Sequence, residues 1–249
     1  MRPKVTEAAE GVLHVEGPGT NWQVLVEGPD VTLVDAAWPR DFHLVAQSLE
    51  AIGRRPEDVV AILLTHAHRD HLGTAAEFSR RYGTPVSSHI DEAPHARGEV
   101  VEEISKLELL ARLWRPKVIL FVANIVRHGA LKVDRLPDVE TFGETGPLDV
   151  PGRPVPISTP GHTSGHCAFH LPERSAVLAG DAFVTFDLLR RRPMLGPMPR
   201  VFDHDPSQAV VSLRRLATLD AQVVLPGHGP PFMGTPATAV EQALSAHPS

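Results

Sequence analysis

The sequence contains very little cysteine and tyrosine. Its 249 residues include one cysteine, Cys167, and one tyrosine, Tyr82. A single cysteine excludes both a disulfide within the chain and a cysteine cluster that binds a metal ion. We expect Cys167 to be buried, because a free cysteine behaves as a small apolar side chain. This cysteine usage fits a reducing compartment, and we expect a cytoplasmic protein.

Long apolar runs and blocks of like charge are also missing. No segment reaches the roughly 20 apolar residues that a membrane span needs, and the N-terminal residues lack the apolar stretch of a secretory signal. The 24 basic and 30 acidic residues are interspersed along a chain of net charge −6. This pattern argues against electrostatic binding of nucleic acid, although it does not exclude a local basic groove. We therefore expect no membrane span and no nucleic-acid partner.

Apolar periodicity and turn residues indicate an α/β fold. Strands and helices alternate in the first third of the chain and again from Pro154, and no linker separates the two parts. We therefore expect a single domain over residues 1–249. The expected strands cover 12–15, 23–27, 31–34, 59–64, 85–88, 155–158, 167–171, 176–179 and 223–225, and the expected helices cover 40–52, 71–82, 207–219 and 237–246.

A helical insertion is expected over about residues 92–135, between the two alternating parts. Apolar residues recur there at helical spacing, and a dense apolar stretch follows over 118–126. Two helices that pack on the core, or on a second copy of the chain in a homodimer, would explain the pattern. A lid or wall that shapes an apolar substrate pocket is an alternative, and a helix that touches a membrane is a third. The recurring residues are Val100, Ile104, Leu107, Leu110 and Trp114.

The chain holds 14 histidines, and several of them gather directly after the expected strand over 59–64. Three histidines and an aspartate within six residues at the exposed end of a strand cannot all face a core. His66 and His68 are two apart on extended backbone and can project to the same side. Asp70 and His71 begin the next helix and point onto a neighbouring position. This arrangement suits two adjacent metal ions better than one.

Three more candidate ligands follow other expected strands, each beside a glycine. They are His162, Asp181 and His228. Ligands collect at strand ends in open α/β sheets, so these sites and the first cluster support one another. Imidazole and carboxylate groups without a thiolate suit zinc, iron or manganese. The sequence therefore predicts a metal centre built from four strand ends.

The motif His66-x-His68-x-Asp70-His71, followed in order by His162, Asp181 and His228, resembles the signature of the metallo-β-lactamase-fold hydrolases. The resemblance covers nearly the whole chain. It implies a four-layer αββα sandwich with two metal ions at one edge of its sheets, most simply two Zn²⁺ per chain, with iron or manganese as alternatives. By this resemblance His66, His68 and His162 hold one ion, Asp70, His71 and His228 hold the other, and Asp181 bridges them. The resemblance also places Asp35 where a carboxylate orients a ligand histidine, with a turn or helix-capping aspartate as the alternative, and we expect His166 to support the centre rather than bind an ion.

Such a ligand set predicts hydrolysis of a small-molecule substrate. Two ions that share a water lower its pKa and hold hydroxide ready to attack a carbonyl, while Asp70 orients it or carries its proton. The expected substrate is a thioester, ester or lactone. Hydroxyacylglutathione is less favoured, since only about twenty residues follow His228, and a lactonase that uses a late tyrosine is disfavoured because Tyr82 lies far upstream.

Other functions of the same family stay open. An iron enzyme that oxidises persulfides is the alternative, and a β-lactamase, a phosphodiesterase or nuclease and a non-catalytic binding protein are less favoured. The run Arg190-Arg191-Arg192 follows Asp181 in the sequence. We interpret it as a solvated loop, with a contact to an anionic substrate as the alternative.

Overall fold

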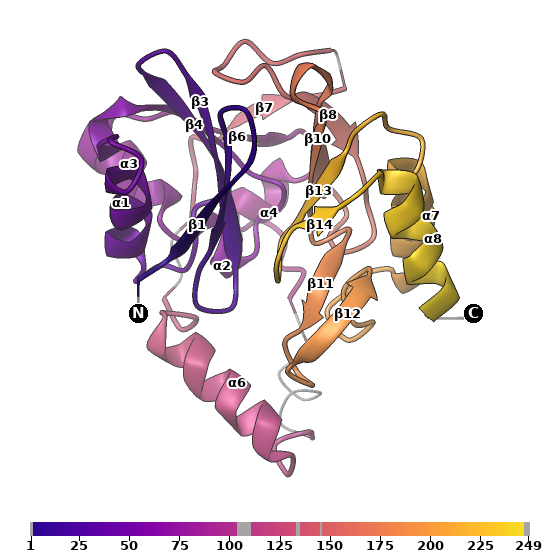
Figure 1. Ribbon diagram of the computed structural model, residues 1–249. Helices are drawn as coiled ribbons and strands as arrows, with labels where there is room; N and C mark the ends of the chain where they lie inside the picture. The colour runs from indigo at the N-terminus through magenta and orange to yellow at the C-terminus, as the bar shows by residue number, and fades with distance from the viewer. Residues whose placement is uncertain (1, 104–110, 133–134, 145, 247–249) are drawn as a thin grey trace.

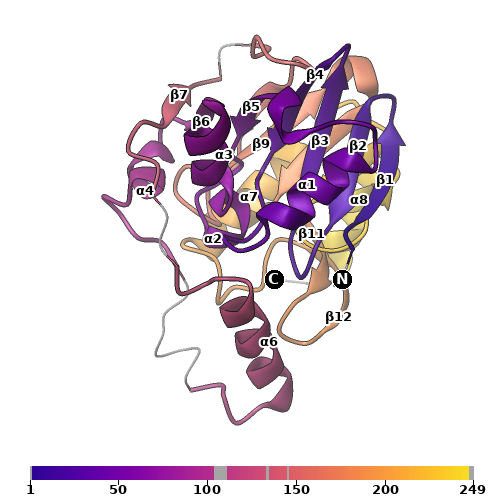
Figure 2. The same cartoon turned by 90° about the vertical axis from the view of Figure 1, so that its left-hand side faces the viewer.

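A computed structural model describes residues 2–103, 111–132, 135–144 and 146–246. Two β-sheets face each other, and helices cover the outer face of each, so the molecule has four layers (Figures 1 and 2). The predicted αββα sandwich is therefore confirmed. None of the helices in the described ranges is long and apolar enough to cross a membrane.

The first sheet has seven strands in the order of the sequence. Its first four strands are antiparallel, and β4 to β7 run parallel, which carries the ends of β4 and β5 to one edge. The strands are β1 (Lys4–Ala9), β2 (Val12–Glu16), β3 (Asn21–Glu27), β4 (Asp30–Val34), β5 (Val59–Leu63), β6 (Val86–His89) and β7 (Glu140–Phe142). The helices of this half are α1 (Phe42–Glu50), η1 (Pro56–Asp58), α2 (Arg69–Leu72), α3 (Ala75–Tyr82) and α4 (Ala93–Arg97).

The second sheet has five strands in the order β14-β13-β10-β9-β8. Here β10 and β13 are parallel neighbours, so the ends of these two strands also reach one edge. The strands are β8 (Val155–Ser158), β9 (Cys167–Leu171), β10 (Ala176–Gly180), β13 (Val223–Pro226) and β14 (Phe232–Met233). A separate hairpin joins β11 (Val184–Asp187) to β12 (Arg192–Gly196), and the helices are η2 (Pro172–Arg174), α7 (Pro206–Leu216) and α8 (Pro236–Ala246).

The central strands are apolar throughout because both of their faces are buried. Successive side chains of a strand point to opposite faces. In β4, Leu33 packs in the cluster beneath the first helices, whereas Val34 packs in the cluster between the two sheets. Ile62 and Leu63 of β5 divide in the same way. The continuous apolar run over 59–64 therefore marks a strand in a four-layer fold.

One expected helix, over residues 71–82, is two helices in the structure. The break between α2 and α3 falls at Gly73, which packs closely on the backbone of residues 37–39. A Cβ at this position would lie 2.4 Å from the carbonyl oxygen of Ala37. The hydroxyl of Thr74 donates to the Ala36 carbonyl at 2.6 Å, which anchors the same turn. This contact places α2, which carries two candidate ligands, against the loop after β4.

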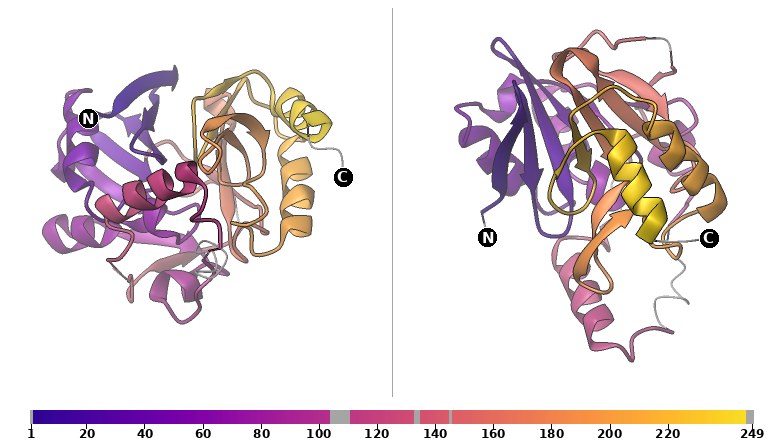
Figure 3. Two further views of the ribbon diagram at one scale, coloured as in Figure 1. Left: turned by 90° about the horizontal axis from the view of Figure 1, so that it is seen from below. Right: turned by 45° about the vertical axis from the view of Figure 1, so that its right-hand side comes forward.

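The middle segment contains α4 and a second helix, α6 (Pro116–Arg127). Ile104, Leu107 and Leu110 of the expected apolar stripe lie outside the described residues, and Trp114 is 75% exposed. In α6 the side chain of Val118 is buried, while Ile119 and Leu120 are more than half exposed. Seen from below, α6 lies across the edge between the two halves (Figure 3). It therefore borders the site instead of filling the core.

Candidate metal centre

The structure brings all seven predicted ligand residues together at one edge of the sheets. His66 and His68 follow β5, and Asp70 and His71 belong to α2. Asp181 follows β10, His228 follows β13, and His162 lies in the loop between β8 and β9. The parallel pairs β4–β5 and β10–β13 deliver these loops to the same place. Topology thus unites side chains that are far apart in the sequence.

The ligand atoms form two groups that share one carboxylate. Nε2 of His162 lies 2.9 Å from Nδ1 of His68 and 3.3 Å from Oδ2 of Asp181, while His66 Nε2 lies 4.0 Å from the same oxygen. On the other side, His71 Nε2 lies 3.5 Å from Oδ1 of Asp181, and His228 Nε2 lies 3.0 Å from its Oδ2. Oδ2 of Asp70 is 3.7 Å from both of these nitrogens. Asp181 therefore lies between the two groups.

Each of five histidines at the centre is fixed by a hydrogen bond through one ring nitrogen. In the neutral tautomer that this bond favours, the ring N–H donates to the protein and the other nitrogen carries a lone pair directed at the centre. The donating bonds run from His66 Nδ1 to Thr65 Oγ1 (3.0 Å), His68 Nε2 to Glu102 O (2.5 Å), His71 Nδ1 to Asp35 Oδ2 (2.7 Å), His162 Nδ1 to Asp203 Oδ1 (3.0 Å) and His228 Nδ1 to Gly19 O (2.7 Å).

Several polar atoms at the centre have no hydrogen-bond partner. Among the described residues, His66 Nε2, His71 Nε2 and Asp181 Oδ1 are buried and unpaired. Buried polar atoms are almost always hydrogen-bonded, so unpaired atoms that converge on one point need a ligand. The donor groups His66–His68–His162, His66–His71–Asp181 and Asp70–His71–His228 each gather within 4.8 Å. The residues present therefore fit metal ions.

The electrostatics of the centre agree with this fit. Burial, reinforced by neighbouring histidines, lowers the pKa values of His66 and His68 well below the usual range, so both rings are neutral. Burial also tends to lower the pKa of His71, but the carboxylates of Asp181, Asp35 and Asp70 outweigh it and raise that pKa to about 10. The negative potential that holds a proton on His71 is the potential that would hold a cation there.

Asp35 and His166 support the centre in different ways. Oδ2 of Asp35 accepts from His71, and its two oxygens also accept from the backbone N–H and the hydroxyl of Thr65, both at 2.8 Å. Asp35 has a φ of 64°, a strained conformation for a residue with a Cβ. His166 accepts from the backbone N–H of Asp181 at 3.1 Å and donates through Nδ1 to Thr159 at 2.8 Å. His166 therefore holds the loop of Asp181 in place and points no free nitrogen at the centre.

Two acidic residues with similar supporting contacts were not anticipated from the sequence. Asp203 accepts from His162, as described above, although it lies far along the chain in a loop without regular spacing. Glu92 is completely buried and accepts four hydrogen bonds, which tie the His66–His68 loop to the His162 loop. Glu92 fell within the expected insertion, where nothing in the pattern indicated a buried carboxylate.

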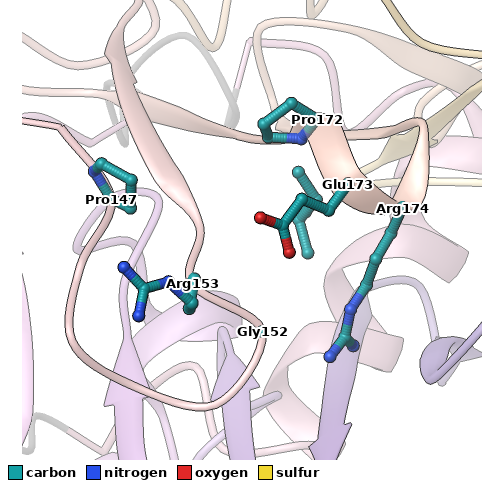
Figure 4. Close-up of a pocket in the computed structure, with 7 residues that line it drawn as sticks. Pro147, Gly152, Arg153, Pro172, Glu173 and Arg174 are labelled. Carbon is teal, nitrogen blue, oxygen red and sulfur yellow. The ribbon is translucent and has the colours of Figure 1, made fainter.

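A small cavity of about 90 Å³ lies at the end of the second sheet that is away from the proposed metal ligands (Figure 4). It sits at the start of β10, whereas Asp181 follows the end of that strand. Arg174 at this cavity donates to the carbonyls of Gly11 and Val26 and so joins the two sheets. The cavity is lined by Pro147, Gly152, Arg153, Leu171, Pro172, Glu173 and Arg174, and it plays no part in the metal centre.

Comparisons with known proteins agree with the motif. A family model described as the metallo-beta-lactamase superfamily matches residues 16–228. The probable metallo-hydrolase YflN of Bacillus subtilis is 30% identical over 242 residues, which cover 92% of this chain and 87% of that protein. A hydroxyacylglutathione hydrolase of Rhizobium meliloti is 30% identical over 134 residues, or 53% of this chain and 37% of that enzyme.

A solved structure agrees as well. The crystal structure of a metallo-beta-lactamase family protein from Thermus thermophilus matches with a TM-score of 0.61 and 27% sequence identity. The match covers 91% of this chain and 73% of that chain. Sequence and fold therefore lead to the same group of proteins.

Proposed function

The chain belongs to the metallo-beta-lactamase superfamily and is a metallo-hydrolase, and from this premise we propose that it hydrolyses a small thioester, ester or lactone with two metal ions, most simply zinc. The observation that carries the proposal is the Asp181 carboxylate, which lies between two groups of ligand atoms. A carboxylate placed in this way suits two adjacent ions. A single ion would leave one of the two groups unpaired.

We assign His66, His68 and His162 to one ion, and Asp70, His71 and His228 to the other, with Asp181 shared. Nitrogen and carboxylate ligands without sulfur suit Zn²⁺, and they also accept Fe or Mn²⁺. When bound, such ions polarise a carbonyl oxygen and lower the pKa of a coordinated water from 15.7 towards 7. The protein supplies the geometry and the proton transfers.

Asp70 is the proposed catalytic side chain. Its carboxylate is 15% exposed, whereas the side chains of His71 and Asp181 are almost fully buried, so Asp70 faces the side from which a substrate enters. Oδ2 lies 3.7 Å from Nε2 of both His71 and His228, and Oδ1 would accept a proton from water. We infer that Asp70 then donates this proton to the leaving group.

Hydrogen bonds from the surrounding residues orient the proposed ligands. Asp35, Asp203 and the Gly19 carbonyl each hold one histidine through the ring nitrogen that faces away from the centre. Ligands fixed in this way need no rearrangement when a substrate binds. The similarity to a hydroxyacylglutathione hydrolase favours a thioester among the candidate substrates.

The proposal is tested on protein purified without added metal. We expect metal analysis to find two zinc ions per chain, and we expect turnover of at least one substrate in a panel of thioesters, esters and lactones. Loss of turnover on chelation, with recovery on adding zinc, would complete the support. One iron per chain together with oxygen uptake on a persulfide would contradict the hydrolase and favour an iron enzyme.

Further proposals concern the whole protein. We propose that residues 1–249 form one domain and that exposed apolar side chains of α6 pack on a second copy of the chain. A dimer mass in light scattering that becomes a monomer mass on Leu120→Glu would support this contact, and a monomer mass for the unaltered protein would contradict it. A cytoplasmic location stays a prediction.

A further inference from the structure

A large cleft of about 1550 Å³ lies beyond His162 of the metal centre, and none of the seven proposed ligands is among its lining residues. One of its lining residues is Asp203, whose Oδ1 accepts the hydrogen bond from His162 Nδ1 at 3.0 Å. From there the cleft passes between the start of α6 and the β11–β12 hairpin, and it reaches α7 and α8. The hairpin and α6 lie next to each other at the lower end of the molecule (Figure 1). A ligand that extends from this cleft past His162 would bring its far end to the proposed reaction site.

The lining of the cleft is strongly basic, although the whole chain has a net charge of −6. One wall carries Arg112, Arg115 and Lys117, and the other carries Arg190, Arg192 and Arg200, with Arg214 from α7. Lys117 Nζ donates to the carbonyl of Arg190 at 2.7 Å, so the two walls touch. The cations therefore surround a common space and are not scattered over the surface.

The carboxylates in the lining are already engaged. Asp187 accepts from two backbone N–H groups and from the guanidinium of Arg190 at 3.2 Å. Asp203 accepts from His162. Asp187 is thus paired with Arg190, and Asp203, which His162 holds, also lies close enough to Arg200 to interact with its charge. The lining has seven cationic side chains and two carboxylates, and this excess of positive charge favours a ligand of opposite sign.

Apolar side chains lie among these cations. Met194, Met198 and Val118 line the cleft, and Trp114 at its rim is 75% exposed. The guanidinium of Arg115 lies 4.8 Å from the centre of the Trp114 ring. An exposed tryptophan beside arginines offers a surface on which a planar ring can stack. The ligand that fits best therefore combines several negative charges with an apolar or aromatic part.

We propose that this cleft binds the phosphate-bearing half of a thioester or ester whose carbonyl group lies at the metal centre. The proposal rests on the hydrolase function above and narrows its substrate class. Phosphates are favoured over a single carboxylate, because several guanidinium groups match several anionic oxygens. A small molecule is favoured over nucleic acid, because these seven cations line one cleft on a protein whose net charge is −6. Ligand pockets hold roughly 300–1,000 Å³, so this cleft has room for a large phosphorylated carrier.

Two thioesters with the same reacting end test the proposal. S-butyryl-coenzyme A carries phosphates and an adenine ring, whereas S-butyryl-N-acetylcysteamine lacks both. We expect kcat/KM to be at least about tenfold higher for the phosphorylated thioester. The double variant Arg192→Gln/Arg200→Gln should reduce this ratio by about tenfold. The matched control is Arg80→Gln on the exposed face of α3, outside the cleft lining, and it should leave the ratio unchanged.

A binding measurement separates this proposal from the hydrolase proposal. Dethio-coenzyme A lacks the thiol that could coordinate a metal, and calorimetry can follow its binding to metal-depleted protein. Binding that weakens in the double variant and at high salt would support the cleft, even if neither thioester is hydrolysed. Equal turnover of the two thioesters, without arginine-dependent binding of dethio-coenzyme A, would overturn the cleft proposal and leave the hydrolase standing. Displacement of dethio-coenzyme A by a more tightly bound single-stranded oligonucleotide would overturn the small-molecule ligand.

Discussion

Replacement of Glu92 by glutamine should both destabilise the protein and weaken metal binding. Glu92 Oε1 accepts from the backbone N–H of Ala67 at 2.7 Å and from His95 Nδ1 at 2.9 Å. Its Oε2 accepts from the hydroxyl of Thr163 at 2.7 Å and from the backbone N–H of Gly165 at 3.1 Å. Ala67 separates two proposed ligands, and Thr163 follows a third. This one carboxylate therefore sets the distance between two ligand-bearing loops.

The size of the effect follows from the hydrogen bonds that glutamine cannot make. A glutamine side chain has one oxygen and one NH₂ group, so in either orientation the NH₂ group would face one backbone N–H, that of Ala67 or that of Gly165, which cannot accept a hydrogen bond. A hydrogen bond to a charged group contributes about 1.5–3 kcal/mol, so the loss of one such bond in a fully buried site predicts that the free energy of unfolding falls by about 1.5–3 kcal/mol. Residues that hold a ligand from outside the metal typically change metal affinity about 10- to 100-fold.

The assay separates stability from metal binding. Urea unfolding of chelator-treated protein gives the free energy of unfolding without metal, and a competition titration with a zinc indicator gives the affinity. Glu50→Gln, at an exposed position of α1, is the matched control. Our reasoning would be refuted if Glu92→Gln stayed within about 0.5 kcal/mol of this control, the range expected for surface changes, with unchanged zinc affinity.

Three further predictions concern other buried groups. Asp203→Asn should weaken zinc binding about tenfold, because it removes the charge behind His162; an unchanged titration would contradict this. Burial lowers the pKa of His14 from 6.5 to about 4. The neutral, buried ring therefore contributes its full stabilisation of the folded protein above pH 6.5, and this contribution is lost as pH falls through 4. The stability advantage over His14→Gln should therefore shrink by roughly 3 kcal/mol across that window, and a constant difference would contradict it. Burial raises the pKa of the Cys167 thiol, so a thiol reagent should react only after unfolding, whereas rapid reaction of the native protein would show an exposed thiol.

Much of the fold could be predicted because the pattern of the sequence is local. The run over 59–64 and the alternation around Gly28 identify β5 and the β3–β4 hairpin directly. Strands that are short or half exposed were missed. β1 has no fully buried side chain, and β14 has only two residues, so neither shows the alternation of apolar and polar residues that predicts a strand. Such strands form because a neighbouring strand offers hydrogen bonds, which no local pattern records.

The clustering of the proposed ligand residues could be predicted for a different reason. His66, His68, Asp70 and His71 lie within one short motif, and glycines accompany the later ligands. Gly227 shows why: a Cβ there would lie 1.9 Å from Oδ1 of Asp181. The supporting carboxylates of Glu92 and Asp203 follow no such spacing, because their role depends on loops that meet only in three dimensions. The basic cleft could not be predicted from the sequence for the same reason, since its cations come from separate segments.

The measurement that tests the central claim most directly is the metal content of Asp181→Ala. Asp181 is buried between both groups of ligand atoms, and its removal leaves three other side chains for each ion. We predict that the unaltered protein binds two zinc ions per chain and that Asp181→Ala binds one tightly, folds as before and loses most of its hydrolytic activity. Two tightly bound ions with full activity in Asp181→Ala would contradict a shared carboxylate at the centre of the site.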